Sequence, residues 1–128
     1  MPICTLPYYG KCELNIVVDI HGVEKELCVL VDTGFTSDTG FGLALPSSFA
    51  NYAMFTGTGN VTVADGREVA VASIPDAKIK KIEQHKLGNS ITVPALFMNG
   101  PDGTIGVLFL QKCSLIFDGP SSKASISF

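Results

Sequence analysis

The stretch Leu27-Cys28-Val29-Leu30-Val31-Asp32-Thr33-Gly34 decides the predicted fold of this chain. Its first five residues form an unbroken apolar run, which predicts a strand covered on both faces. The run stops at Asp32, and Asp-Thr-Gly is typical of a tight turn in which the glycine lets backbone approach closely. A carboxylate there lies at the mouth of a rigid sheet, which is the setting that an aspartyl general base requires.

Strands and turns are predicted on both sides of this stretch. Apolar residues alternate along residues 14–20, the period-2 pattern of a half-buried strand. Asp65-Gly66 lies between the alternating runs 61–63 and 69–71, which predicts a β-hairpin. Further strands are expected at residues 43–45, 77–83, 91–98, 114–117 and 124–128, a turn at Leu87-Gly88-Asn89, and short helices at residues 48–55, capped by Ser47, and 107–110.

Length and composition predict one folded domain spanning residues 1–128. Hydrophobic residues are 46% of the 128 and charged residues only 16%, which argues against intrinsic disorder. The net charge of −3 argues against a nucleic-acid partner held by phosphate contacts. Because the sequence has neither a signal-peptide pattern nor a long apolar run, we expect a cytoplasmic protein with no membrane partner.

The cysteines and histidines do not predict a metal site. Cys4, Cys12, Cys28 and Cys113 are widely spaced and include no C-x-x-C pair, and the two histidines lie far apart in the sequence. Structural zinc sites need closely spaced ligands. We therefore expect no metal and no cofactor, and reduced thiols lying mostly in the core of an intracellular protein.

Several segments, in order and rough spacing, resemble the retropepsin-like aspartic proteases, particularly their small prokaryotic members. The resemblance covers about residues 13–128 and is far more specific than the tripeptide alone. The matching segments are Val31-Asp32-Thr33-Gly34-Phe35-Thr36, Leu43-Ala44-Leu45-Pro46, residues 61–69, Ile105-Gly106-Val107-Leu108-Phe109-Leu110, and Leu115-Ile116-Phe117-Asp118-Gly119-Pro120.

This resemblance implies an all-β acid-protease lobe with one or two short helices, closed by homodimerisation, that cleaves a peptide or protein substrate. It implies that Asp32, Thr33 and Gly34 form the catalytic motif. It also implies that the hairpin at residues 61–71 is a flap over the bound peptide. The substrate-binding residues expected on this basis are Phe35, Thr36, Val63, Ala64, Asp65, Gly66 and Ile105.

Asp38-Thr39-Gly40 repeats the tripeptide six residues after Asp32. We predict Asp32 as the catalytic carboxylate because a buried strand precedes it, whereas Asp38 follows Phe35-Thr36-Ser37. Asp38 is expected in a lengthened loop, for which a place at the substrate groove stays open. Two aspartates in one loop cannot readily form a symmetric pair, because each needs its own rigid support.

The chain offers one well-supported carboxylate, so proteolysis requires a second copy of Asp32 across a two-fold axis. The resemblance implies that the chain ends, near residues 1–6 and 124–128, help to build the dimer sheet. Relatives often carry a polar residue just after the glycine that corresponds to Gly106, but Val107 and Leu108 are apolar. Two alternatives remain: a non-catalytic dimer or peptide-binding module with this fold, and a fragment that needs flanking sequence to dimerise.

Overall fold

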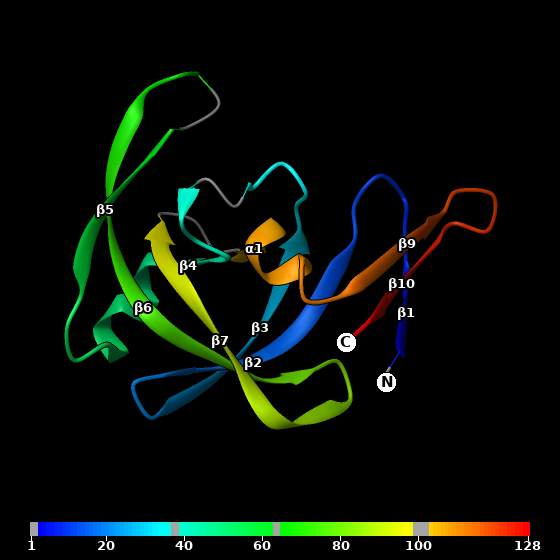
Figure 1. Cartoon of the computed structure of the whole chain (residues 1–128), viewed down its shortest axis with the longest axis horizontal. Helices are drawn as coiled ribbons and strands as arrows, with labels where there is room; N and C mark the ends of the chain where they lie inside the picture. The colour runs from blue at the N-terminus through cyan, green and yellow to red at the C-terminus, as the bar shows by residue number, and fades with distance from the viewer. Residues whose placement is uncertain (1–2, 37–38, 63–64, 99–102) are drawn as a thin grey trace.

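The computed structural model describes residues 3–36, 39–62, 65–98 and 103–128. It is an all-β protein with short helices, as predicted (Figure 1). The part of the chain that it describes contains no helix long and apolar enough to span a bilayer. The elements are β1 (Ile3–Pro7), β2 (Glu13–Ile20), β3 (Val23–Val31), β4 (Leu43–Pro46), the 3₁₀ helix η2 (Ser47–Tyr52), β5 (Gly57–Thr62), β6 (Glu68–Ile82), β7 (His85–Met98), β8 (Gly103–Ile105), α1 (Val107–Leu110), β9 (Ser114–Asp118) and β10 (Lys123–Ser127).

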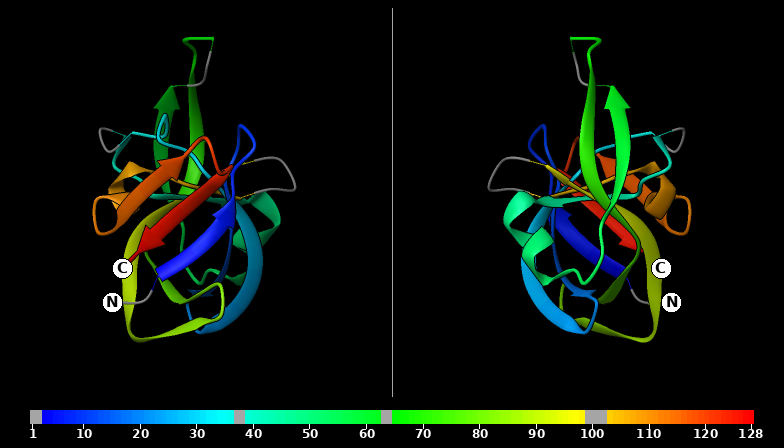
Figure 2. Two further views of the ribbon diagram at one scale, coloured as in Figure 1. Left: turned by 90° about the vertical axis from the view of Figure 1, so that its right-hand side faces the viewer. Right: turned by 90° about the vertical axis from the view of Figure 1, so that its left-hand side faces the viewer.

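The larger sheet has the order β2-β3-β8-β4-β7-β6-β5, and β2 also pairs with β6. This extra pairing closes six of the strands into a barrel, which removes their open edges. β5 pairs only with β6 and extends the sheet beyond the closed part, so that the β5–β6 hairpin projects from the barrel (Figures 1 and 2).

The interior of the barrel is filled by the apolar positions that alternate along its strands. In β2 the side chains of Leu14, Ile16, Val18 and Ile20 are at most 1% exposed, which confirms the predicted strand. In β6 the side chains of Ile79 and Ile82 are fully buried. Phe109 of α1 is also fully buried, so the helix packs against the same core.

The prediction that residues 27–31 are covered on both faces is wrong for this chain. Val29 is fully buried, but Cys28 is exposed and Leu30 is half-buried. β3 alternates instead, since a barrel strand turns one face to the core and the other outward. Asp32 therefore follows a strand that is supported from the inside of the barrel only.

The hairpin predicted around Asp65-Gly66 is present, since β5 and β6 pair antiparallel and Gly66 has a φ of +87°. The turn predicted at Leu87-Gly88-Asn89 is wrong: β6 ends at Ile82, β7 begins at His85, and the turn is Glu83-Gln84. Glu83 fixes it, because its carboxylate accepts the Asn15 N–H at 2.9 Å and its own N–H donates to the Asn15 carbonyl at 2.7 Å.

The first predicted helix is shorter than expected and is not capped by Ser47. η2 begins at Ser47 itself, Pro46 precedes it as the N-cap residue, and no side-chain capping bond forms. In so short a helix the first-turn amides, which have no partner within the helix, are a large share of the total, and no side-chain cap satisfies them here. The helix predicted at residues 107–110 is confirmed as α1.

The chain ends form a separate three-stranded sheet with the order β1-β10-β9 (Figure 2). β1 pairs with β10 of the same chain along its whole length, from Ile3 opposite Ser127 to Pro7 opposite Lys123. Tyr8 stacks on Phe117 with ring centroids 4.7 Å apart. Both terminal strands are thus already paired within one chain, and the free edges of this sheet belong to β1 and β9.

Candidate active site

Asp32 is the first residue after β3, and its backbone is held from both sides. The Asp32 N–H donates to the carbonyl of Ile105 at 2.9 Å, which continues the parallel pairing of β3 with β8. The preceding Val31 N–H donates to the Cys12 carbonyl at 2.8 Å. Asp32 therefore lies where β3, β8 and the segment at Cys12 meet. Asp32 itself is outside the strands and belongs to a loop.

The Asp-Thr-Gly segment folds as the expected Asx turn. The Gly34 N–H donates to Asp32 Oδ1 at 2.8 Å, and the Phe35 N–H donates to the Asp32 carbonyl at 3.2 Å. A Cβ atom on Gly34 would lie 3.1 Å from Asp32 Oδ1, so glycine is the residue that best admits this carboxylate position. A donor aimed at one oxygen fixes the orientation of the Asp32 side chain.

The start of α1 supports this turn from below. The Val107 N–H donates to the Phe35 carbonyl at 2.8 Å, and the Gly106 N–H donates to the Gly42 carbonyl at 2.9 Å. A Cβ atom on Gly106 would come within 2.6 Å of the Phe35 carbonyl oxygen. The glycine at position 106 therefore allows α1 to approach the Asp32 turn closely.

A cavity of about 540 Å³ opens beside Asp32. One side is formed by the Asp32 turn and the strands β4, β7 and β8, and the other by β5 of the projecting hairpin. Its volume is within the range of small-ligand and peptide side-chain sites. It is lined by Asp32, Gly34, Phe35, Thr36, Thr39, Ala44, Asn60, Val61, Thr62, Leu96, Met98 and Thr104.

The predicted site residues divide among several places. Asp32, Gly34, Phe35 and Thr36 line the cavity, whereas Thr33 is exposed and is not part of the lining. Ile105 does not form a cavity wall as expected: it is fully buried, because its side chain points into the barrel core.

The structure describes only some of the hairpin residues that were predicted to bind substrate. Asp65 and Gly66 are exposed at the tip of the hairpin and do not line the cavity, while Val63, Ala64 and Asp38 fall outside the described residues. At the tip, Asp65 accepts from the Arg67 guanidinium at 2.6 Å and from the Arg67 N–H at 3.0 Å. These two hydrogen bonds stabilise the turn, so Arg67 contributes to the structure of the hairpin.

Part of the cavity lining was not predicted from the sequence. Asn60 and Thr62 come from β5, and Leu96, Met98 and Thr104 come from strands that reach the site only through the barrel pairing. The pairing of β4 with both β7 and β8 brings these residues together. No local pattern signals it, because the partners are about fifty residues apart in sequence.

Asp32 is the sole carboxylate among the described residues that line the cavity. It is half-buried, and its Oδ1 is already hydrogen-bonded to backbone. Across the described ranges no group of three or more histidine, cysteine or acidic side chains gathers in a way that would hold a metal ion. Among the described residues, one carboxylate therefore faces a groove whose lining is about equally polar and apolar.

Comparisons with known proteins give a match at the level of structure. No protein-family model matches the chain, and no curated protein matches it in sequence. The structure is similar to that of a retropepsin-like aspartic protease from Rickettsia conorii, with a TM-score of 0.65, 14% identity, and coverage of 99% of this chain and 91% of that one. The fold is retropepsin-like. At 14% identity this similarity shows the fold and does not show the function.

Proposed function

We propose that this protein is a homodimeric aspartic endopeptidase in which two copies of Asp32 activate one water molecule. The observation that carries the proposal is the carboxylate of Asp32, the one carboxylate among the described residues that line the cavity, fixed by Gly34 and Ile105 in a retropepsin-like lobe. A lobe with one supported carboxylate is half of an aspartic protease site, and a two-fold axis supplies the other half.

In the proposed reaction the two carboxyl groups share one proton, because two like charges a few ångströms apart do not both ionise. The ionised Asp32 takes a proton from water, and the oxygen of that water bonds to the scissile carbonyl carbon. The protonated Asp32 of the second copy gives its proton to the carbonyl oxygen. The first carboxyl then gives its proton to the amide nitrogen while the second, now ionised, takes a proton from a hydroxyl of the diol. The C–N bond breaks, the amine leaves, and the pair again holds one proton.

The cavity walls support an extended peptide as the substrate. Phe35 and Met98 are half-buried and offer apolar surface for a side chain, while the edge of β5 at Asn60 and Thr62 offers backbone groups. Extended peptides bind sheet edges by main-chain hydrogen bonds and place alternate side chains in pockets. The β5–β6 hairpin serves as the flap in this proposal, held at its tip by Asp65 and Arg67.

The terminal sheet supports a contact between copies. Ile3 on the β1 edge is 60% exposed, and Ile116 and Phe117 on the β9 edge are 65% and 43% exposed. Unpaired edges with apolar side chains favour strand addition by another chain. Because β1 and β10 pair internally, we propose that the copies add edge to edge instead of exchanging their terminal strands.

Cleavage of a peptide mixture, followed by mass spectrometry, tests the proposed function. The wild-type protein should cut peptides, and Asp32→Asn should lose at least about a thousandfold in rate, since it removes the shared proton site. Glu26→Gln is the matched control, because Glu26 is an exposed carboxylate on the same strand and outside the cavity. Equal rates for the wild type and Asp32→Asn would overturn the assignment.

The same experiment addresses the non-catalytic alternative. Val107 and Leu108, immediately after Gly106, are apolar and half-buried, so no polar side chain at these two positions is available to tie the copies together. A binding module with this fold would retain peptides without cutting them at any pH between about 4 and 7, where a carboxyl pair shares its proton. Saturable peptide binding with no product would identify that function.

A further inference from the structure

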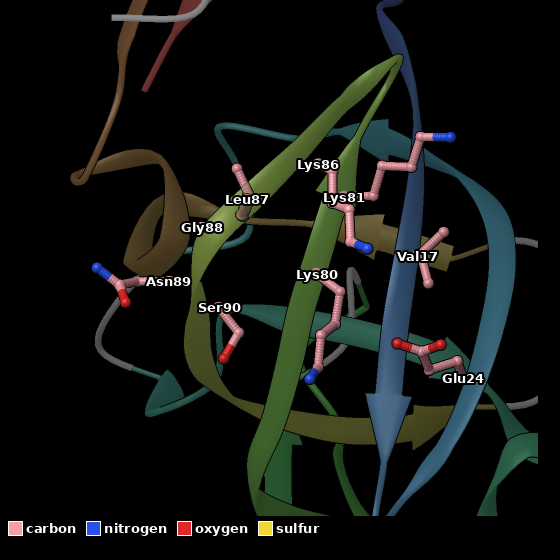
Figure 3. A pocket seen from close by; sticks show the side chains of 9 residues that line it. All are labelled: Val17, Glu24, Lys80, Lys81, Lys86, Leu87, Gly88, Asn89 and Ser90. Atoms are coloured by element: carbon pink, nitrogen blue, oxygen red, sulfur yellow. The ribbon is translucent and has the colours of Figure 1, made fainter.

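A hollow of about 740 Å³ lies away from Asp32 on the outer face of the barrel (Figure 3). It shares no lining residue with the Asp32 cavity. Three of the side chains around it are lysines and one is a glutamate, although the whole chain carries a net charge of −3. It is lined by Val17, Glu24, Lys80, Lys81, Lys86, Leu87, Gly88, Asn89 and Ser90, and we call it the lysine groove.

A β-bulge in β6 turns two consecutive lysines to this face. Between β2 and β6 the register shifts, so that Val18 pairs with Ile79, Val17 pairs with Lys81, and Lys80 is the extra residue. Neighbours in a regular strand point to opposite faces, and a bulge breaks that alternation. Both Lys80 and Lys81 are half-buried and line the groove as a result.

A second irregularity opens the groove on the side of β7. Ile79 of β6 pairs with Ile91, and Lys81 pairs with Lys86, so residues 87–90 of β7 have no paired residue on β6. This segment is exposed at Gly88, Asn89 and Ser90. The bowed strand leaves a concave wall with backbone at its surface, and Gly88 adds no side chain to fill it.

The lysines are poorly compensated within the chain. Lys81 and Lys86 lie directly opposite each other on neighbouring strands, and like charges at such positions are destabilising. Lys80 lies 3.8 Å from Asp19, whereas no ion pair within the described residues involves Lys81 or Lys86. A fold that accumulates uncompensated positive charge in a hollow is suited to an anion.

We propose that the lysine groove binds an oligophosphate, that is, a chain of two or more phosphoryl groups. Figure 3 shows the ammonium groups spread along the groove, which fits several linked charges better than a single phosphate. Lysine is a strong point-charge partner for phosphate, and exposed backbone N–H groups add hydrogen bonds. The groove volume is that of a small-molecule site. The proposal does not depend on the proposed peptidase function.

Calorimetric titration of the whole protein with inorganic tripolyphosphate tests this proposal. We expect saturable one-to-one binding that weakens as salt is added. Lys81→Gln combined with Lys86→Gln should weaken it at least tenfold, whereas Glu24→Gln should strengthen it about threefold by removing a like charge. Lys123→Gln is the control, since Lys123 is an exposed lysine on β10 in the other sheet, and it should change affinity less than about twofold.

A folding readout separates lost binding from lost structure. Lys86→Glu places opposite charges across from each other, so it should raise the melting temperature while abolishing tripolyphosphate binding. Titration with ATP distinguishes a nucleotide from a free polyphosphate as the source of the phosphoryl chain. Absence of saturable tripolyphosphate and ATP binding at millimolar concentration, or binding that survives the double lysine substitution, would overturn the proposal. Tighter binding of a hexaglutamate peptide through the same lysines would replace it with an acidic protein partner.

Discussion

The backbone N–H of Gly34 donates to Asp32 Oδ1 at 2.8 Å, and this bond sets the direction of the carboxylate in the candidate active site. Gly34 does not have a positive φ, so its role is to leave space and not to adopt an unusual backbone conformation. The orientation of the key side chain therefore depends on a residue that contributes no side chain of its own.

Gly34→Ala should reduce peptide cleavage by about tenfold while the protein stays folded, because a new Cβ atom 3.1 Å from Asp32 Oδ1 displaces the carboxylate by a few tenths of an ångström. Initial rates and the thermal melt of the purified variant check this. Gly119→Ala is the matched control, since a Cβ at that position meets nothing within 4 Å. If Gly34→Ala cleaves peptide at the wild-type rate, the orientation of the Asp32 carboxylate does not limit the reaction.

Gly106→Ala should destabilise the fold by about 1–3 kcal/mol, because its Cβ would lie 2.6 Å from the Phe35 carbonyl oxygen and 2.7 Å from the ring. The carbonyl oxygen and the ring both belong to Phe35, in the turn that holds Asp32, so moving either of them lowers the free energy of unfolding. Urea unfolding measures the loss. If Gly106→Ala unfolds at the wild-type urea midpoint, the close packing of α1 on the turn does not stabilise the protein.

The cysteines predict a loss of stability in alkali. Burial raises the pKa of Cys113 to about 11 from an ordinary 9.0, and burial also raises the pKa values of Cys4 and Cys12. The folded state then binds these protons more tightly than the unfolded state. The contribution of each thiol is fully present below pH 9 and for Cys113 is lost as pH rises toward 11.

Urea unfolding at a series of alkaline pH values measures this loss, and Cys113→Ala should flatten part of the decline. At pH 8 a thiol reagent should modify exposed Cys28 much faster than the other cysteines, all of which are free thiols. Rapid modification of all four, or a stability that does not change between pH 9 and 11, would contradict the burial seen for Cys113.

Local patterns predicted the fold class and most elements well. The alternation along β2, the Asp-Gly hairpin and the helix at residues 107–110 were all readable, because each depends on a few neighbouring residues. The exposure of the outer face of β3 was not, because a barrel strand with an apolar outer face looks the same in sequence as a strand covered on both faces. The turn at Glu83-Gln84 was not predicted, because Glu83 is held by hydrogen bonds to Asn15, a residue far away in sequence.

The candidate site was predictable at its centre and not at its walls. Asp32 and Gly34 were identifiable from the tripeptide behind an apolar run, whereas Leu96 and Met98 reach the cavity through parallel pairing of β7 with β4. Ile105 was wrongly predicted to line the cavity, because an apolar residue beside a glycine is equally typical of a cavity wall and of a hydrophobic core. The bulge that gathers Lys80 and Lys81 is likewise invisible without the register.

The central claim is that each active site needs Asp32 from two chains, and mixing subunits tests it most directly. Inactive Asp32→Asn protein is added to a fixed amount of wild type, the chains are allowed to exchange, and peptide cleavage is measured. If only dimers with two Asp32 residues are active, an equal amount of the variant should lower the rate to about half, and a threefold excess to about a quarter. A rate that does not change with added Asp32→Asn would contradict a shared site.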